Sequence, residues 1–274
     1  MVQRVTTGAL LILGLSLVLY LGSWVFAVTA MAAIGIAMHE EFHALAVAGH
    51  RPVWWPTFAA MGASIPMVLM SSAVAIIPLT LTCCLIVLII VIFREKPKLE
   101  DALVSVMPMF TILLPGMCLI SLLAVSPKSL QVTLLCLVFA VAVMGDTFAY
   151  FVGTRVGGRK LCPAVSPNKT ISGAMGGLIG SVLAALAVGA VAAIWASEHA
   201  AELPTWDQYL FIGLIGGVAG QMGDLFASLI KRHCGIKDYS SLFPGHGGML
   251  DRMDSILFAA VVVFCFRVMM TGTA

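Results

Sequence analysis

Apolar runs long enough to cross a bilayer recur along nearly the whole chain. A transmembrane helix needs about 17–25 predominantly apolar residues. Of the 274 residues 61% are hydrophobic and 10% are charged, whereas about a quarter of a soluble domain is charged. We therefore expect an all-α polytopic integral membrane protein that contacts the lipid bilayer and no nucleic acid. The nine expected spans cover approximately residues 6–21, 23–38, 55–71, 73–93, 103–124, 129–150, 171–196, 208–230 and 254–271.

Basic residues are unevenly distributed between the loops of this nine-span arrangement. All but two of the 15 Lys and Arg fall in loops on the N-terminal side, the exceptions being Lys128 and Arg267. Because cytoplasmic loops collect Lys and Arg, we expect a cytoplasmic N-terminus in a bacterial-type inner membrane, with the active site facing the cytoplasm. A cleaved signal peptide is disfavoured, since the apolar character continues past the A-x-A-like site at residues 30–32.

Two of the predicted cytoplasmic loops, residues 154–170 and 231–253, each hold four Lys or Arg together with Gly and Pro. Attraction to anionic lipid headgroups accounts for basic loops, but it does not account for the acidic residues among them. We therefore divide the chain into N-terminal transmembrane helices, residues 1–125, and a catalytic transmembrane region, residues 126–274, which contains both loops.

Polar residues follow one face of the eighth expected span. Gln221, Asp224, Ser228 and Lys231 are spaced so that they share one side of a helix. A carboxylate inside a membrane span is costly and usually faces a polar cavity. A purely structural Asp–Lys pair is the alternative interpretation of this face.

The loop that follows combines glycines with two further acids. Gly245, Gly247 and Gly248 allow close approach of the backbone to a ligand and can present N–H groups to phosphate oxygens. Asp251 and Asp254 are three residues apart where the ninth span begins, so both carboxylates can face one site. Helix capping is the alternative role for Asp254.

Acids and bases interleaved in this way indicate a magnesium–phosphate site. Mg²⁺ prefers oxygen ligands and usually shares one or two carboxylates with substrate phosphates. The acids are Asp224, Asp251 and Asp254, and the bases are Lys231, Arg232, Lys237 and Arg252. Asp146, near the end of the sixth span, and the following Gly-Gly-Arg-Lys sequence that ends at Lys160 add to the same predicted cytoplasmic layer.

Glycines repeat every three or four residues in the seventh and eighth spans. Such patterns favour close helix packing, so we expect these two spans to contact each other, or a second protomer, through their glycine faces. The glycines are Gly173, Gly176, Gly177 and Gly180, followed by Gly213, Gly216, Gly217 and Gly220.

The segment His39-Glu40-Glu41-Phe42-His43 fits the H-E-x-x-H pattern of zinc proteases. Such a site would use His39 and His43 as ligands and Glu40 as the general base, and it needs a third ligand from elsewhere. The seven cysteines form neither a CxxC pair nor a zinc-ligand spacing, and we expect no disulfide framework. An intramembrane zinc metalloprotease therefore stays open as an alternative function.

The C-terminal motifs resemble the signature of the phosphatidate cytidylyltransferases, or CDP-diacylglycerol synthases. They are S-x-x-K-R-x-x-x-x-K-D, from Ser228 to Asp238, and P-G-H-G-G-x-x-D-R-x-D-S, from Pro244 to Ser255. Residues 146–160 and 166–170 resemble the upstream patterns of the family. Glu41-Phe42, with the later Gly49 and Pro52, resembles a run that follows its second span, which places the H-E-x-x-H segment at the membrane interface.

The resemblance implies a homodimer that joins CTP to phosphatidic acid for phospholipid biosynthesis, with release of diphosphate and dependence on Mg²⁺. It implies Asp224, Asp251 and Asp254 near the metal, and catalytic roles for Asp224, Asp251, Lys231 and Arg252. The expected substrate-binding residues are Asp146, Lys160, Asn168, Lys169, Ser228, Arg232, Lys237, Asp238, His246, Gly247 and Gly248. Another CTP-dependent lipid-modifying enzyme, such as a polyprenol kinase, and a transporter remain alternatives.

Overall fold

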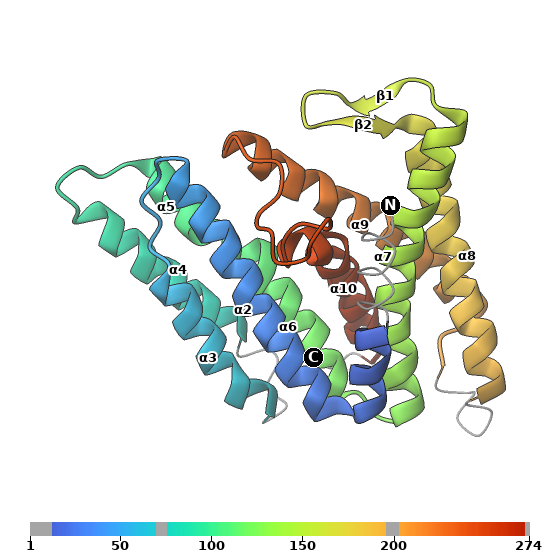
Figure 1. The fold of residues 1–274 in the computed structure, drawn as a ribbon. Coiled ribbons are helices and arrows are strands. Elements are labelled where there is room, and N and C mark those ends of the chain that lie inside the picture. The colour runs from blue at the N-terminus through green and yellow to red at the C-terminus, as the bar shows by residue number, and fades with distance from the viewer. Residues whose placement is uncertain (1–12, 70–75, 196–202, 272–274) are drawn as a thin grey trace. The chain divides into compact units, whose positions relative to one another are not determined.

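The computed structural model describes residues 13–69, 76–195 and 203–271 (Figure 1). It contains two compact units that do not follow chain order. The first unit comprises the described residues up to Leu123 together with Lys231–Met253, and the second comprises Ala124–Ile230 together with the described residues from Asp254 onward. Two helices, α9 (Trp206–His233) and α10 (Leu250–Thr271), each continue from one unit into the other.

The first unit is built from apolar helices. Its last helical segment is continuous from Leu99 to Ala124 but contains one π-helical turn, which follows Pro108. A proline lacks the N–H that an α-helix requires, and a wider turn is one way to accommodate the missing bond. The elements are α2 (Ser23–Val47), α3 (Trp55–Leu69), α4 (Ile76–Ile92), α5 (Leu99–Pro108), η2 (Met109–Leu113), α6 (Leu114–Ser121) and η3 (Leu122–Ala124).

Polar contacts join two connecting loops of the first unit. The backbone N–H of Arg51, after α2, donates to the Asp101 carboxylate at the start of α5 (2.9 Å). The guanidinium of Arg94, after α4, donates to the Arg51 carbonyl (2.7 Å) and lies 3.5 Å from Asp101. These two basic loops, which charge distribution predicts on one side of the membrane, therefore lie next to each other.

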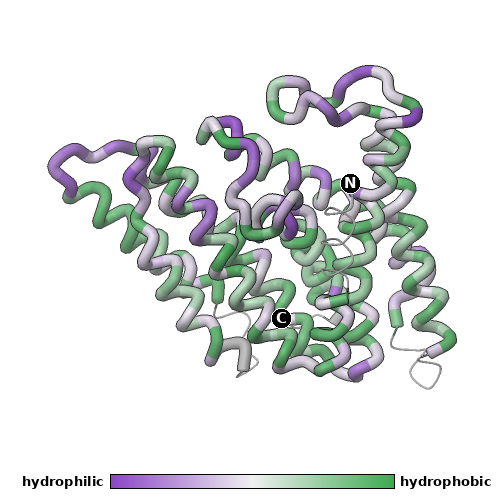
Figure 2. Tube along the Cα trace, viewed as in Figure 1, coloured by the Kyte–Doolittle hydropathy of each residue, from purple (hydrophilic) through white to green (hydrophobic). Residues whose placement is uncertain are grey.

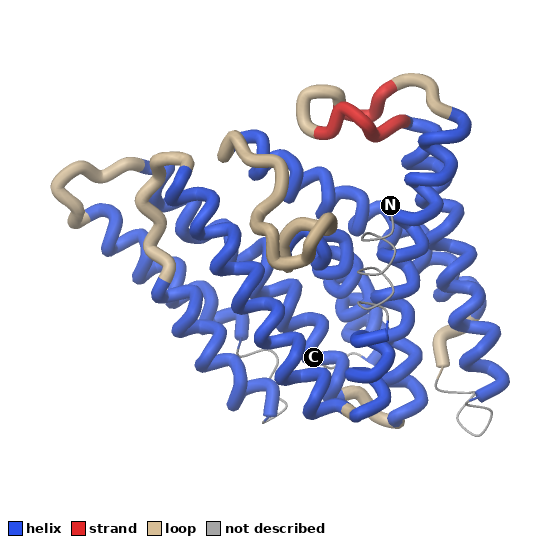
Figure 3. Tube along the Cα trace, viewed as in Figure 1, coloured by secondary structure: helices blue, strands red, loops and turns tan. Residues whose placement is uncertain are grey.

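The second unit pairs a helical bundle with a small hairpin. The strands β1 (Lys160–Cys162) and β2 (Ser166–Thr170) are antiparallel, with Lys160 opposite Thr170 (Figure 3). The all-α prediction missed this hairpin because its strands are only three and five residues long. The helices are α7 (Lys128–Val156), α8 (Ile171–Trp195) and the greater parts of α9 and α10.

Local signals fix the ends of these helices. α7 ends at Gly157, whose φ of +64° suits glycine and whose N–H returns to the Gly153 carbonyl (3.1 Å). α8 begins after Thr170, whose hydroxyl accepts the N–H of Gly173 (3.0 Å) as an N-cap. The hairpin therefore connects the C-terminal end of α7 to the N-terminal end of α8.

Glycines let the helices of the second unit approach closely. A methyl group at Gly173 of α8 would lie 2.8 Å from the Ala149 carbonyl oxygen and 3.1 Å from the Gly153 Cα in α7. In α9, a methyl group at Gly217 would lie 2.7 Å from the Ser181 Cβ of α8. The predicted contact between the seventh and eighth spans is therefore present, although Gly173, Gly176 and Gly180 of α8 face α7.

Six of the described helical segments are long and apolar enough to cross a bilayer, which makes the chain a helical membrane protein. They are Ser23–Val47, Leu99–Ala124, Lys128–Val156, Ile171–Trp195, Trp206–His233 and Leu250–Met270, while α4 is a shorter apolar helix of 17 residues. Hydrophilic residues gather in the connecting loops (Figure 2). Nine spans remain a prediction, since residues 6–12 of the first expected span, and the break at residues 70–75, lie outside the described residues.

Candidate active site

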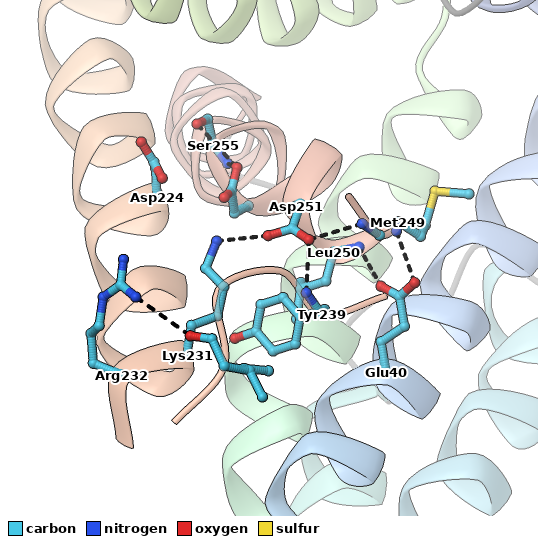
Figure 4. Close-up of polar contacts among 12 residues, drawn as sticks. Glu40, Asp224, Lys231, Arg232, Tyr239, Met249, Leu250, Asp251 and Ser255 are labelled. Atoms are coloured by element: carbon cyan, nitrogen blue, oxygen red, sulfur yellow. Dashed lines mark hydrogen bonds and ion pairs between the residues drawn. The ribbon is translucent and has the colours of Figure 1, made fainter. Parts of the chain in front are cut away.

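The first turn of α10 holds Asp251 in a dense set of hydrogen bonds (Figure 4). Its Oδ1 accepts from the Lys231 ammonium, at the end of α9, over 2.6 Å. Its Oδ2 accepts from the backbone N–H of Tyr239 (3.0 Å) and of Gly248 (2.9 Å). Asp251 is buried, and a buried carboxylate is tolerated only when donors of this kind compensate its lost hydration.

A tight turn brings the glycine loop to this carboxylate. The Phe243 N–H donates to the Gly247 carbonyl (2.9 Å), and the His246 N–H donates to the Phe243 carbonyl (2.8 Å). Gly247 has a φ of +81°, and a methyl group there would lie 2.6 Å from Asp251 Oδ2. Both the backbone conformation and the close approach therefore require glycine at this position.

A second buried carboxylate, Glu40 of α2, binds the same segment (Figure 4). Its Oε1 accepts from the Ser240 hydroxyl (2.6 Å) and the Met249 N–H (3.0 Å), and its Oε2 accepts from the Leu250 N–H (2.8 Å). The first N–H groups of a helix have no intrahelical partner. Glu40 therefore caps α10 from a position 210 residues earlier than Leu250 in the chain.

In the second unit, three oxygen-bearing side chains converge. The Ser255 hydroxyl lies 2.9 Å from Asp146 Oδ2 on α7 and 3.3 Å from Asp254 Oδ1 on α10. The Ser255 N–H also donates to Asp254 Oδ1 (2.7 Å). Asp146 and Asp254, predicted separately from the sequence, thus lie on either side of one hydroxyl group.

Asp224, on α9, forms a close ion pair with Lys169 of β2. Both side chains are about one-quarter exposed, at 26% and 28% respectively, which leaves the pair open to a charged ligand. The Gln221 side-chain amide, one turn earlier, donates to the Ala174 carbonyl on α8 (3.0 Å). The predicted polar face of α9 therefore anchors both the hairpin and α8.

The remaining predicted substrate-binding residues differ in burial. Ser228 is buried, and the buried Nδ1 of His246 has no hydrogen-bond partner within the described part of the chain. The others are exposed: Lys160, Asn168, Arg232, Lys237 and Asp238, as is the predicted catalytic Arg252. These roles stay predictions, because burial and exposure do not by themselves assign a substrate.

The donor set fits Mg²⁺, although no group of three or more His, Cys, Asp or Glu gathers closely enough for a metal among the described residues. Mg²⁺ needs only one or two protein carboxylates when substrate phosphates complete its shell. Asp251 and Asp254 stand one turn apart on α10. Asp251 Oδ1 accepts a single hydrogen bond and keeps a second lone pair for a cation.

The H-E-x-x-H segment does not build a zinc centre within the described residues. His39 and His43 are exposed and stack on each other, with ring centroids 6.2 Å apart. Among the residues that the structure describes, no third His, Cys, Asp or Glu joins them. Glu40, the general base that the protease alternative requires, is held in the contacts with Ser240 and α10. Nothing here supports the protease alternative.

Cys234 adjoins the site without providing a nucleophile. Burial raises the pKa of its thiol above the usual range, and the negative charge of Glu41 raises it further. The thiolate is the reactive form of cysteine, so a raised pKa keeps this residue inert near neutral pH.

A model of the cytidylyltransferase family matches residues 2–270, which is nearly the whole chain. The chain belongs to the cytidylyltransferase family. This confirms the resemblance that the C-terminal motifs carry.

Individual relatives cover less of the chain. A phosphatidate cytidylyltransferase of Bacillus subtilis is 46% identical over 114 residues, 41% of this chain and 39% of the relative. One of Brucella abortus is 40% identical over 134 residues, 49% of this chain and 46% of the relative. An uncharacterised protein of Escherichia coli, YnbB, is 44% identical over 121 residues, 44% of this chain and 38% of the relative. The chain spans less than half the length of these curated relatives.

Two contributors to the candidate site were missed by sequence reasoning. Ser255 belongs to the family motif, but only the fold shows its hydroxyl between two carboxylates. Glu40 was considered only as part of a zinc site. Its signal was an acidic residue inside an apolar span, a placement that is costly and often functional.

Proposed function

We propose that this protein transfers the cytidylyl group of CTP to phosphatidic acid, giving CDP-diacylglycerol and diphosphate for phospholipid biosynthesis. The observation that carries the proposal is the Lys231–Asp251 pair (2.6 Å), set by the glycine loop in the motif shared with the family. This pair places an ammonium group next to a carboxylate. The ammonium suits substrate phosphates, and the carboxylate suits the metal ion that accompanies them. The names of two relatives supply the lipid and the nucleotide transfer by analogy.

The reaction is an in-line displacement at phosphorus. An oxygen of the lipid phosphate forms the new bond to the α-phosphorus of CTP, the bond from that phosphorus to the bridging oxygen breaks, and diphosphate leaves with the electron pair. Little covalent chemistry is needed from the protein, which positions the groups and compensates charge. Lys231 and Lys169 provide that positive charge, each from an existing pair with an aspartate.

We assign the metal ligands to Asp224, Asp251 and Asp254. These three residues would hold Mg²⁺, which would supply positive charge against the negative charge that develops on the leaving diphosphate. Asp251 and Asp254 share the first turns of α10, and the Ser255 hydroxyl orients Asp254. Asp224 is paired with Lys169, and the ammonium group of this lysine would also suit a nucleotide phosphate.

We infer the membrane orientation from the distribution of basic residues. In the first unit, the loop after α2, the loop after α4 and the segment 231–249 all carry basic residues, and contacts join them. His50 and His233, for example, meet at 2.8 Å between ring nitrogens. We place these loops on the cytoplasmic side of the inner membrane, where CTP is present, and we assign the active form to a homodimer.

Purified protein in detergent tests the function directly. Incubated with phosphatidic acid and Mg²⁺, it should form CDP-diacylglycerol from CTP, and substantially less nucleotide-lipid from ATP or GTP, as measured by mass spectrometry of the lipid extract. Diacylglycerol in place of phosphatidic acid is the matched control and should give no product. A modified lipid formed equally well from diacylglycerol, or no lipid product with CTP, would reject the proposal.

A further inference from the structure

Glu40 is a buried acid that the proposed chemistry does not use. It is 5% exposed and lies in the apolar helix α2, where an uncompensated carboxylate would be strongly unfavourable. Three donors compensate it: the Ser240 hydroxyl and the backbone N–H groups of Met249 and Leu250. The positive end of the α10 dipole adds to this stabilisation.

The three donors lie on both sides of the glycine loop. Ser240 precedes the loop, while Met249 and Leu250 follow it at the start of α10. One carboxylate therefore fixes both ends of the glycine loop. Gly248 lies within these ends and Tyr239 lies directly before Ser240, and the N–H groups of these two residues bind Asp251.

The close contact between Glu40 and the glycine loop requires glycine at position 248. A methyl group at Gly248 would lie 2.6 Å from each carboxylate oxygen of Glu40, closer than real contacts allow. The Glu40 carboxylate therefore packs directly against the backbone of Gly248, and Gly248 contacts two acidic side chains. Its N–H binds Asp251, and its missing side chain makes room for Glu40.

We propose that Glu40 is a positioning residue, which holds the glycine loop and the first turn of α10 so that Asp251 and Lys231 meet the phosphates and the metal in the productive geometry. This inference deepens the proposed function and rests on it. Glu40 itself touches no reacting atom. It acts through the hydrogen bonds that fix the Asp251 carboxylate.

An isosteric amide cannot replace this carboxylate. Glutamine has one acceptor oxygen, so its NH₂ group must face either the Leu250 N–H or the side shared by Met249 and Ser240. In either orientation a backbone donor meets another donor. Glu40→Gln thus disrupts the hydrogen bonds that hold the glycine loop and the start of α10, while it preserves side-chain size.

Two readouts on the full-length protein test the inference. With CTP and phosphatidic acid, Glu40→Gln should lower kcat about tenfold to a hundredfold, the range expected for lost hydrogen bonds to a charged group, and should raise the Mg²⁺ concentration for half-maximal rate. Hydrogen exchange of the Met249 and Leu250 amides should accelerate about tenfold or more. Ser240→Ala, which leaves two of the three donors, should show a smaller change in the same direction.

Glu41→Gln is the matched control. Glu41 is the adjacent carboxylate of the same helix, 1% exposed, and Thr111 is 3.5 Å from its Oε2. This variant should keep wild-type kcat, Mg²⁺ dependence and amide exchange. Wild-type values in Glu40→Gln, or equal losses in Glu41→Gln, would overturn the inference. An inactive wild-type protein would instead reject the proposed function, while the exchange comparison would still decide whether Glu40 holds the loop.

Discussion

At the scale of single residues, the site consists of charged groups whose partners are fixed by folding. Asp251 binds Lys231 and two backbone N–H groups, and Asp224 binds Lys169. The sequence predicted that these acids and bases would gather, because their spacing puts them near helix ends. It could not predict which acid pairs with which base, since that depends on how the hairpin and the glycine loop fold back.

The central residue-scale prediction concerns Asp251→Asn. The amide keeps the size of the side chain but removes the charge that faces Lys231 and the proposed cation. We expect kcat to fall about a thousandfold or more, as for loss of a catalytic metal ligand. Steady-state kinetics over a range of Mg²⁺ concentrations measures this effect.

Asp207→Asn is the control for that variant. Asp207 is an exposed carboxylate in the first turn of α9, at the other end of the helix from Lys231. Its removal should leave the rate unchanged. Wild-type turnover in Asp251→Asn would show that the metal assignment is wrong.

At the scale of elements, the sequence predicted those features that depend on the residues of a single helix. The long apolar runs correspond to helices, and glycine spacing in α8 and α9 indicated close packing. The partner of each face was not predictable, and Gly173, Gly176 and Gly180 of α8 proved to face α7. The β1–β2 hairpin was also missed, because strands of three and five residues are too short to show a periodic pattern.

The α7–α8 contact gives a test of packing. In Gly173→Ala, the added methyl group meets the Ala149 carbonyl and the Gly153 Cα, which are backbone atoms that cannot rotate away. Overpacking of this kind costs about 1–3 kcal/mol, so the thermal unfolding midpoint in detergent should fall by about 5 °C. Gly62→Ala, in α3, is the control, since nothing lies within 4 Å of its added methyl group. Equal midpoints for the two variants would contradict the close contact.

At the scale of the whole molecule, contacts between distant parts of the chain decide the fold. Residues 231–253 belong to the same compact unit as the N-terminal helices, although about a hundred residues separate them in sequence. The predicted division at residue 125 follows chain order, and a division of that kind cannot assign residues 231–253 to the N-terminal unit. A local pattern such as H-E-x-x-H cannot show that its glutamate bonds to residues 200 to 210 positions away.

The membrane orientation is a whole-molecule prediction. The uneven distribution of basic residues predicts that the loop after α4 is cytoplasmic and the segment before α9 is on the opposite side. Alkaline phosphatase folds to its active form only outside the cytoplasm. A fusion after Lys98 should be inactive and one after Pro204 active, each expressed in a bacterial host. The reverse pattern would place the active site on the wrong side for cytoplasmic CTP.

The transfer of a labelled phosphate tests the central claim most directly. Purified protein is given phosphatidic acid, Mg²⁺ and CTP labelled at either the α- or the γ-phosphate. Cytidylyl transfer predicts that α-label enters the lipid extract while γ-label appears only in aqueous diphosphate. A CTP-dependent lipid kinase would put the γ-label into lipid instead, and that result would contradict the account.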